Sequence, residues 1–116
     1  MMNEYIFNKI DCDNDKYWLI KSFFNSLNLS EKLLDGVSNI INRTGFVINE
    51  MYCHFPDLNN YDPEWHFEGI MFGVCEDEIV VPESVGFSYV RLACEKYLQL
   101  HPEDSAKVST LLAQLP

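Results

Sequence analysis

WHFEGIMFGVCEDEIVV, residues 65–81, is the stretch of sequence that decides the fold. Residues 65–75 and 78–81 are rich in aromatic and β-branched side chains, which favour pleated, half-buried strands. Glu76 and Asp77 lie between the two runs and are typical of a turn. We therefore predict an antiparallel β-hairpin over this stretch.

The segments on either side of the hairpin complete the predicted domain. Residues 46–55 have strand composition, and Pro82 stops the strand at 78–81. Apolar residues recur at helical spacing before and after these strands. We expect Asp11 to Asp15 to cap the first helix, Ser30 the second and Ser84 the third, with Gly45 ending the second. His101 and Pro102 mark a break before a last helix. The apolar positions of the four helices are Trp18, Ile20, Phe24 and Leu27; Leu33, Leu34, Val37, Ile40 and Ile41; Val90, Cys94, Tyr97 and Leu98; and Val108, Leu111, Leu112 and Leu115.

This order of elements predicts an α+β fold. The expected architecture is a single domain over residues 1–116, with about three antiparallel strands (46–55, 65–75 and 78–81) packed against N-terminal and C-terminal helices. A chain of 116 residues with 47% apolar residues can bury a core without disulfides or metals.

The charge of the chain is concentrated in its middle. Between Arg43 and Arg91 there are nine carboxylates and no lysine or arginine, so this acidic segment carries nearly all of the net charge of −10. A field of one sign attracts partners of the opposite sign and repels partners of the same sign. Nucleic acid and anionic membranes are therefore poor partners, and a basic protein is a good one. The nine acids are Glu50, Asp57, Asp62, Glu64, Glu68, Glu76, Asp77, Glu78 and Glu83.

The start of the chain and its cysteines favour a cytosolic protein. Residues 1–7 (MMNEYIF) do not form a basic leader followed by a long apolar run. The cysteines at 12, 53, 75 and 94 are scattered, without a Cys-x-x-Cys pair. Two disulfides are formally possible, but we expect free thiols, with Cys94 in the core.

Two groups of acidic and histidine residues have spacings that could ligate a metal ion. Asp11, Asp13 and Asp15 begin like a calcium loop, but Lys16 and Ser22 stand where that loop needs a glycine and a glutamate. Helix capping is the simpler interpretation. Glu64, His66 and Glu68 alternate along a predicted strand and would face the same side, as in a metal or acid-base site. A polar, solvent-exposed sheet face predicts the same residues, so we expect neither a metal nor another cofactor.

Aromatic residues are interleaved with the acids around a predicted loop from Pro56 to Pro63. Tyr61 and Trp65 are the clearest examples, and aromatic anchors within a charged rim are typical of protein interfaces. The alternative for each aromatic residue is a place in the core.

A set of residues in the second half of the chain resembles a known family. They are residues 67–73 (FEGIMFG), 76–78 (EDE), Tyr89, Val90, Cys94, Tyr97 and residues 101–104 (HPED). They are similar to the immunity proteins of contact-dependent growth inhibition (CDI) systems associated with ribonuclease toxins, over residues 64–116. The resemblance implies a cytosolic protein that is not an enzyme. It would bind and neutralise the C-terminal toxin domain of a cognate effector.

The sequence thus leads to one main hypothesis and two alternatives. A ribonuclease carries basic residues in its cleft, so an inhibitor can occlude the active site with an acidic surface, anchored by Tyr61 or Trp65. The alternatives are a small metal-dependent or acid-base enzyme using Glu64, His66 and Glu68, and a general acidic adaptor protein. The predicted toxin-binding residues are Asp57, Tyr61, Asp62, Glu64, Trp65, Glu68, Glu76, Asp77 and Glu78.

Overall fold

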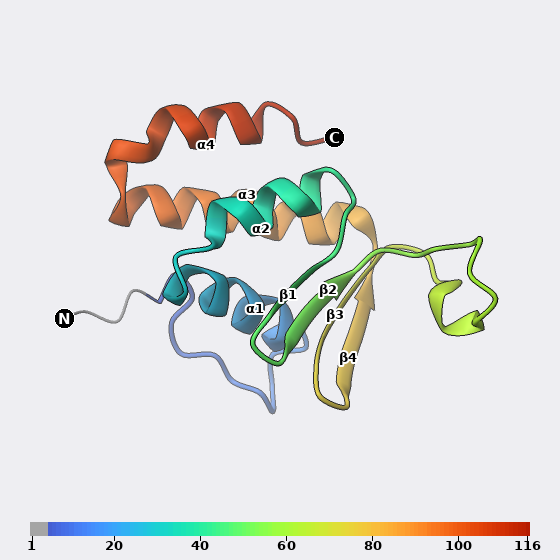
Figure 1. Cartoon of the computed structure of the whole chain (residues 1–116). Coiled ribbons are helices and arrows are strands. Elements are labelled where there is room, and N and C mark those ends of the chain that lie inside the picture. Colours follow the sequence, from blue (N-terminus) through green and yellow to red (C-terminus); the bar gives the residue numbers. More distant parts are fainter. Residues whose placement is uncertain (1–4) are drawn as a thin grey trace.

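Four antiparallel strands form a sheet in the order β1-β2-β3-β4 in the computed structural model, which describes residues 5–116 (Figure 1). The strands are β1 (Phe46–Ile48), β2 (Met51–His54), β3 (Ile70–Val74) and β4 (Asp77–Val81). With the helices on one side of this sheet, the α+β fold class predicted from the sequence is confirmed. Residues 1–4, which belong to the stretch for which no leader is predicted, lie outside the described residues.

The prediction of one continuous strand over residues 46–55 was wrong, because this stretch forms two strands, β1 and β2. Asn49 and Glu50 make a two-residue turn between β1 and β2, with Ile48 opposite Met51. Asn49 has a φ of 55°, in the left-handed region that asparagine tolerates better than most residues. The chain therefore reverses within what looked like one continuous run.

The predicted hairpin at 65–81 is present with different bounds. β3 begins at Ile70 rather than at Trp65, because Pro63–Trp65 forms a 3₁₀ helix, η1. The turn is made by Cys75 and Glu76, since Val74 pairs with Asp77. Cys75 takes the positive φ of 54° that the tight turn needs. β4 accordingly begins one residue earlier than predicted.

The helices follow the apolar periodicity of the sequence, but their caps differ from the predictions. The helices are α1 (Trp18–Leu29), α2 (Leu33–Ile41), α3 (Glu83–Leu100), η2 (Pro102–Asp104) and α4 (Ser105–Leu112). The predicted caps at Asp11–Asp15, Ser30 and Ser84 were wrong, because Tyr17, Lys32 and Pro82 occupy the N-cap positions without side-chain cap bonds.

Both N-terminal helices end in a left-handed residue that is not glycine. Glu31 after α1 and Arg43 after α2 have φ values of 58° and 57°. In each case two backbone N–H groups after the helix donate hydrogen bonds to carbonyls of its last turn. Lys32 N donates to Leu27 O at 2.8 Å, and Thr44 N donates to Asn39 O at 2.8 Å. The prediction that Gly45 ends α2 was therefore wrong.

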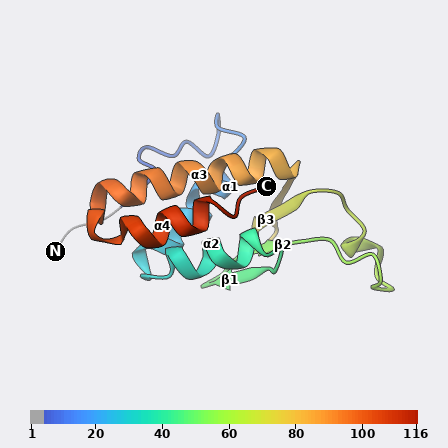
Figure 2. The ribbon, with the colours of Figure 1, turned by 90° about the horizontal axis from the view of Figure 1, so that it is seen from above.

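The core lies between α1 and the inner face of the sheet. Cys53 and Phe72 point inward and are fully buried, and the Phe72 ring packs against Phe23 and Phe24 of α1, with centroids 5.5 and 6.3 Å away. Burial of each such side chain contributes about 1.5–3 kcal/mol. α4 packs on both α2 and α3 above this layer (Figure 2). Cys94 is also fully buried, which confirms its predicted place in the core.

The N-terminal segment is fixed to α1 by a buried asparagine. Asn25 Oδ1 accepts hydrogen bonds from the backbone N–H groups of Ile6 and Phe7 at 3.0 and 2.9 Å. Its Nδ2 donates to Phe7 O at 2.8 Å. Ile6 and Phe7 are buried as a result and belong to the core, with the Phe7 ring centroid 6.1 Å from that of Tyr89 on α3.

The aspartates at 11–15 form a local turn rather than a helix cap. Asp11 Oδ1 accepts from the backbone N–H groups of Asp13 and Asn14, and Asp15 accepts from Tyr17 N at 2.9 Å and pairs with Lys21 at 2.6 Å. The hydrogen bond from the Lys21 ammonium lowers the pKa of Asp15. These carboxylates are thus engaged by the protein itself.

Two further features of the described residues concern the thiols and the lengths of the helices. All four cysteines are free, with Cys12 and Cys75 exposed and Cys53 and Cys94 buried. Within residues 5–116, none of the helices has the length and apolar character needed to span a bilayer.

Candidate functional site

Eight carboxylates of the acidic segment are exposed and have no cationic partner in the part of the chain that the structure describes. Glu83, the ninth, forms a bidentate ion pair with Arg43, at 2.9 and 2.8 Å. Within residues 5–116, the other eight pair with no lysine or arginine. Their charges are therefore available to a partner. They are Glu50, Asp57, Asp62, Glu64, Glu68, Glu76, Asp77 and Glu78, and all are exposed.

Four of these acids lie on a loop that projects from the body of the protein (Figure 1). This protruding loop, residues 55–69, connects β2 to β3 and contains η1. Its base is closed by a hydrogen bond from Asp57 N to Trp65 O at 2.8 Å. Asp62 Oδ1 caps η1 by accepting from Glu64 N at 3.0 Å, and Asp57 Oδ1 accepts from Asn59 N at 3.1 Å. The carboxylates of Asp57 and Asp62 thus hold the loop in shape, while those of Glu64 and Glu68 have no partner among the described residues.

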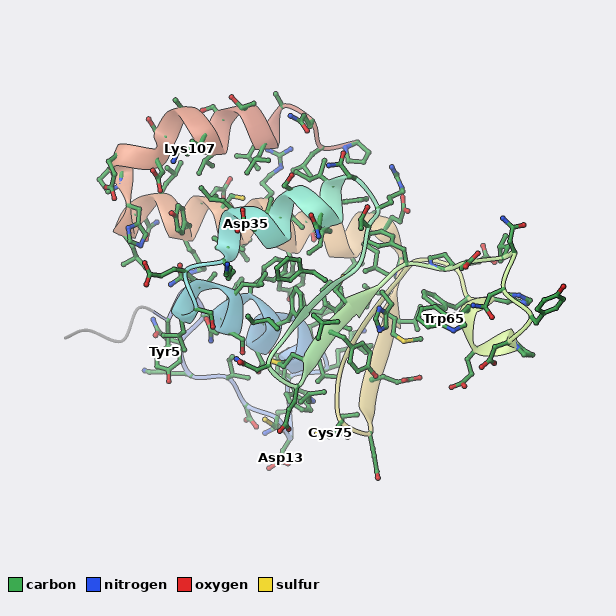
Figure 3. All side chains as sticks on the ribbon, in the orientation of Figure 1. Tyr5, Asp13, Asp35, Trp65, Cys75 and Lys107 are labelled. Carbon is green, nitrogen blue, oxygen red and sulfur yellow. The ribbon has the colours of Figure 1, made fainter. Side chains whose placement is uncertain are left out.

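The two proposed aromatic anchors have different environments. Tyr61 is 102% exposed, and neighbouring Leu58 is 73% exposed, so the protruding loop presents two apolar side chains to solvent. Trp65 is half-buried and lies at the base of the loop, where it contacts the sheet (Figure 3). Its ring meets the His54 ring edge-on, with centroids 5.0 Å apart.

The other four acids lie at the opposite end of β2. Glu50 belongs to the β1–β2 turn, and its Oε2 accepts from the Cys75 thiol at 3.4 Å, which joins that turn to the β3–β4 turn. Glu76, Asp77 and Glu78 follow Cys75. Since β2 has four residues, roughly 13 Å of strand separates this group from the protruding loop. The predicted binding residues therefore form two groups, one at each end of the sheet.

The outer face of the sheet lies between these two groups and was missed in the sequence. Pairing places Val47, Tyr52, Gly73 and Glu78 in one row, and His54, Met71 and Val80 in the next. We call these seven residues the outer face. Because side chains alternate along a strand, the buried Cys53 directs Tyr52 and His54 outward. That alternation was the signal available in the sequence.

Aromatic rings stack along the outer face. The Tyr52 and His54 rings are 4.8 Å apart and nearly parallel. Tyr52 lies over Gly73, where a Cβ atom would collide with its ring, and its hydroxyl contacts Glu78 Oε1 at 3.3 Å. Burial lowers the pKa of His54, and burial together with the charge of Glu78 raises the pKa of Tyr52. Both shifts favour the uncharged forms of these side chains at neutral pH.

The metal or acid-base site suggested by Glu64, His66 and Glu68 loses its structural basis. The predicted strand at 65–75 begins only at Ile70, so these residues do not alternate along a strand. His66 Nε2 instead contacts the Asn60 carbonyl at 2.6 Å within the protruding loop. Among the residues that the structure describes, no three histidine, cysteine or acidic side chains gather to hold a metal ion.

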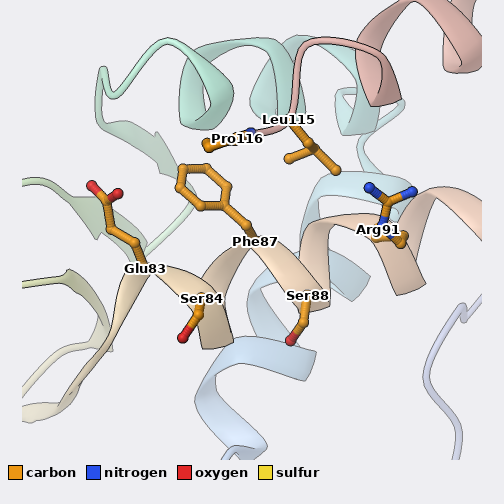
Figure 4. Close-up of a pocket in the computed structure, with 7 residues that line it drawn as sticks. All are labelled: Glu83, Ser84, Phe87, Ser88, Arg91, Leu115 and Pro116. Carbon is orange, nitrogen blue, oxygen red and sulfur yellow. The ribbon is translucent and has the colours of Figure 1, made fainter.

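A shallow hollow of about 420 Å³ lies between α3 and the end of the chain (Figure 4). Its lining contains two serines, Ser84 and Ser88, but neither histidine nor cysteine. Ser88 donates its hydroxyl hydrogen to Val85 O at 2.6 Å, and the carboxylate of Glu83 is paired with Arg43. The lining thus lacks the base that would activate a serine.

Comparison with known protein families accounts for most of the chain. A family model described as CDI immunity protein matches residues 16–112. The chain belongs to the CDI immunity protein family. The match includes all four strands and helices α1 to α4, so both acid groups and the outer face lie within the family domain.

A solved structure supports the fold of this immunity protein. The crystal structure of an immunity protein from Neisseria meningitidis MC58 superimposes with a TM-score of 0.77, at 20% sequence identity. The alignment covers 97% of this chain and 99% of that chain. No curated protein sequence matches. The family match confirms the sequence-based resemblance to immunity proteins, and the shared fold includes the first 60 residues, where that resemblance was vaguer.

Proposed function

We propose that this immunity protein binds the C-terminal nuclease domain of its cognate effector in the cytosol and blocks the nuclease active site without catalysis. The observation that carries this proposal is the set of eight exposed carboxylates without cationic partners. A nuclease, and a ribonuclease in particular, binds a polyanion and needs a basic cleft. Acids that have no cationic partner among the described residues can pair with that cleft without breaking an existing ion pair.

Electrostatic attraction also favours the rapid association that neutralising a toxin requires. Charge complementarity raises association rate constants to about 10⁸–10⁹ M⁻¹ s⁻¹ at low salt, against about 10⁵–10⁶ for neutral pairs. The rigid hydrogen bonding of the protruding loop lowers the conformational entropy lost on binding. Tyr61 and Leu58, at 102% and 73% exposure, are apolar groups that a toxin surface can bury.

Paired charge reversals test the proposal. Glu64→Lys with Glu68→Lys alters the protruding loop, and Glu76→Lys with Asp77→Lys alters the β3–β4 turn. The control is Glu31→Lys with Glu95→Lys, which makes the same change in net charge at exposed sites outside both groups. Association with the purified, catalytically inactive toxin domain of the cognate effector is measured by stopped flow at about 20 and 200 mM salt.

We expect each test pair to lower the association rate at least tenfold at low salt, because the steering field is weakened. The difference should shrink at high salt, where charges are screened beyond about 8–10 Å. The control pair should retain at least half of the unaltered rate. Equal rates and equal salt dependence in all three folded variants would refute occlusion by an acidic surface. Similar binding to unrelated basic proteins would instead favour the general acidic adaptor.

A further inference from the structure

The outer face of the sheet combines apolar exposure with the charge pattern of a binding surface. Val47 and Val80, on the two edge strands, are 62% and 39% exposed. Only Glu78 of the seven outer-face residues is charged. A solvent-facing side of an antiparallel sheet is ordinarily polar at these positions. Apolar residues gathered on an open face indicate a surface that is covered in a complex.

The aromatic residues of this face are held in position before any partner arrives. Tyr52 is fixed by three neighbours: the Gly73 backbone beneath it, the stacked His54 ring at 4.8 Å and the Glu78 carboxylate. Trp65 then packs edge-on against His54, which ties the protruding loop to the face. Rings that are already ordered lose little side-chain entropy on binding.

The charges around the face select the partner. Glu78 lies on the face, Glu50, Glu76 and Asp77 lie at one end, and the acids of the protruding loop lie at the other. A second copy of this chain would bring like charges together, because each copy has a net charge of −10. A basic partner with an apolar patch between its cationic groups matches both the acids at the two ends of the outer face and the apolar residues between them.

We propose that the outer face is the central contact for the toxin domain, with Tyr52, Val47 and Val80 as its apolar centre and the two acid groups as its rim. This inference rests on the proposed function and deepens it, since it places the interface on the sheet rather than on the protruding loop alone. Interfaces with this arrangement concentrate their affinity in a few central residues shielded by a polar rim.

Polar substitutions at the exposed valines test the inference. Val47→Gln with Val80→Gln removes apolar contact area without changing charge. Leu29→Gln with Leu92→Gln is a matched control, because these leucines are 46% and 39% exposed on α1 and α3. Circular dichroism and urea unfolding establish that all variants fold, and Tyr52→Leu is a third variant at the centre. Affinity for the inactive toxin domain is measured by titration calorimetry at two salt concentrations.

The expected result is at least a tenfold loss of affinity for Val47→Gln with Val80→Gln and for Tyr52→Leu, with an unchanged salt dependence. The control should remain within twofold of the unaltered protein. If the valine and tyrosine variants bind normally while the charge reversals weaken binding, the inference is wrong and the proposed function stands. If the unaltered protein does not bind the toxin domain, both are wrong. The inference would also be wrong if the unaltered protein formed concentration-dependent dimers and the Val47→Gln, Val80→Gln double variant were monomeric. A second copy of the chain would then occupy the outer face.

Discussion

Asn25→Ala should be among the most damaging single substitutions in this protein. Asn25 is 6% exposed, and its amide satisfies the N–H groups of Ile6 and Phe7 and the carbonyl of Phe7. Alanine cannot replace any of these three hydrogen bonds. The N-terminal segment then either remains docked with unpaired polar groups or detaches from α1.

The cost of each outcome can be worked from the structure. Three buried polar groups left without partners cost about 1–3 kcal/mol each if the segment stays docked. Detachment instead exposes Ile6 and Phe7, at about 1.5–3 kcal/mol each, and returns about 1–2 kcal/mol of backbone entropy per freed residue. Detachment that frees these two residues therefore costs at most about 4 kcal/mol, less than the roughly 3–9 kcal/mol of the docked state, so we expect a loss of about 1–4 kcal/mol. A domain of this size typically has only about 5–15 kcal/mol in total.

Urea unfolding followed by circular dichroism measures this loss, and amide hydrogen exchange locates it at Ile6 and Phe7. Asn39→Ala is the control, because Asn39 is half-buried and makes one long bond, to Gly45 O at 3.4 Å. That variant should lose less than about 1 kcal/mol. An Asn25→Ala variant no less stable than the control, with unchanged exchange at Ile6 and Phe7, would refute the role given to this asparagine.

Two further predictions concern single positions. Glu31→Gly should stabilise the protein by up to about 1 kcal/mol in urea unfolding, because glycine relieves the left-handed φ of 58° at some cost in chain entropy; a lower urea midpoint would contradict it. Burial lowers the pKa of His54 below its ordinary value of 6.5, so the unfolded state binds the proton more readily. The stabilising contribution of neutral His54 is therefore complete above about pH 6.5 and is lost as the pH falls towards its folded-state pKa. The urea midpoint of His54→Gln, measured between pH 5 and 8, should fall less steeply with acid than that of the unaltered protein, and parallel curves would exclude this contribution.

Sequence periodicity located the helices well but not their ends. The apolar face predicted for α2 is buried as expected, since Leu33, Val37 and Ile40 are fully or almost fully buried. Ser30 looked like the start of that helix and is instead the C-cap of α1. The reason is that Glu31 adopts a left-handed conformation, for which glutamate gives no sequence signal.

The candidate site was only partly accessible to sequence reasoning. The acids and Tyr61 were found from composition, and the structure places them on exposed surfaces. The outer face was not found, because it depends on pairing that brings Val47, Tyr52 and Glu78 from three strands into one row. A continuous run of strand-forming residues at 46–55 concealed the turn at Asn49 that creates this row.

The hydrogen bond from Asp57 N to Trp65 O has a consequence for how this protein can diversify. It closes the protruding loop at its own base, and most of the loop's remaining polar contacts are internal. Lengthening or rewriting such a loop costs chiefly closure entropy, about 0.6 kcal/mol for each doubling of length. Changes between Asp57 and Trp65 are thus insulated from the hydrophobic core. The toxin contacts proposed for that loop can thus change while the fold of the sheet and helices stays the same.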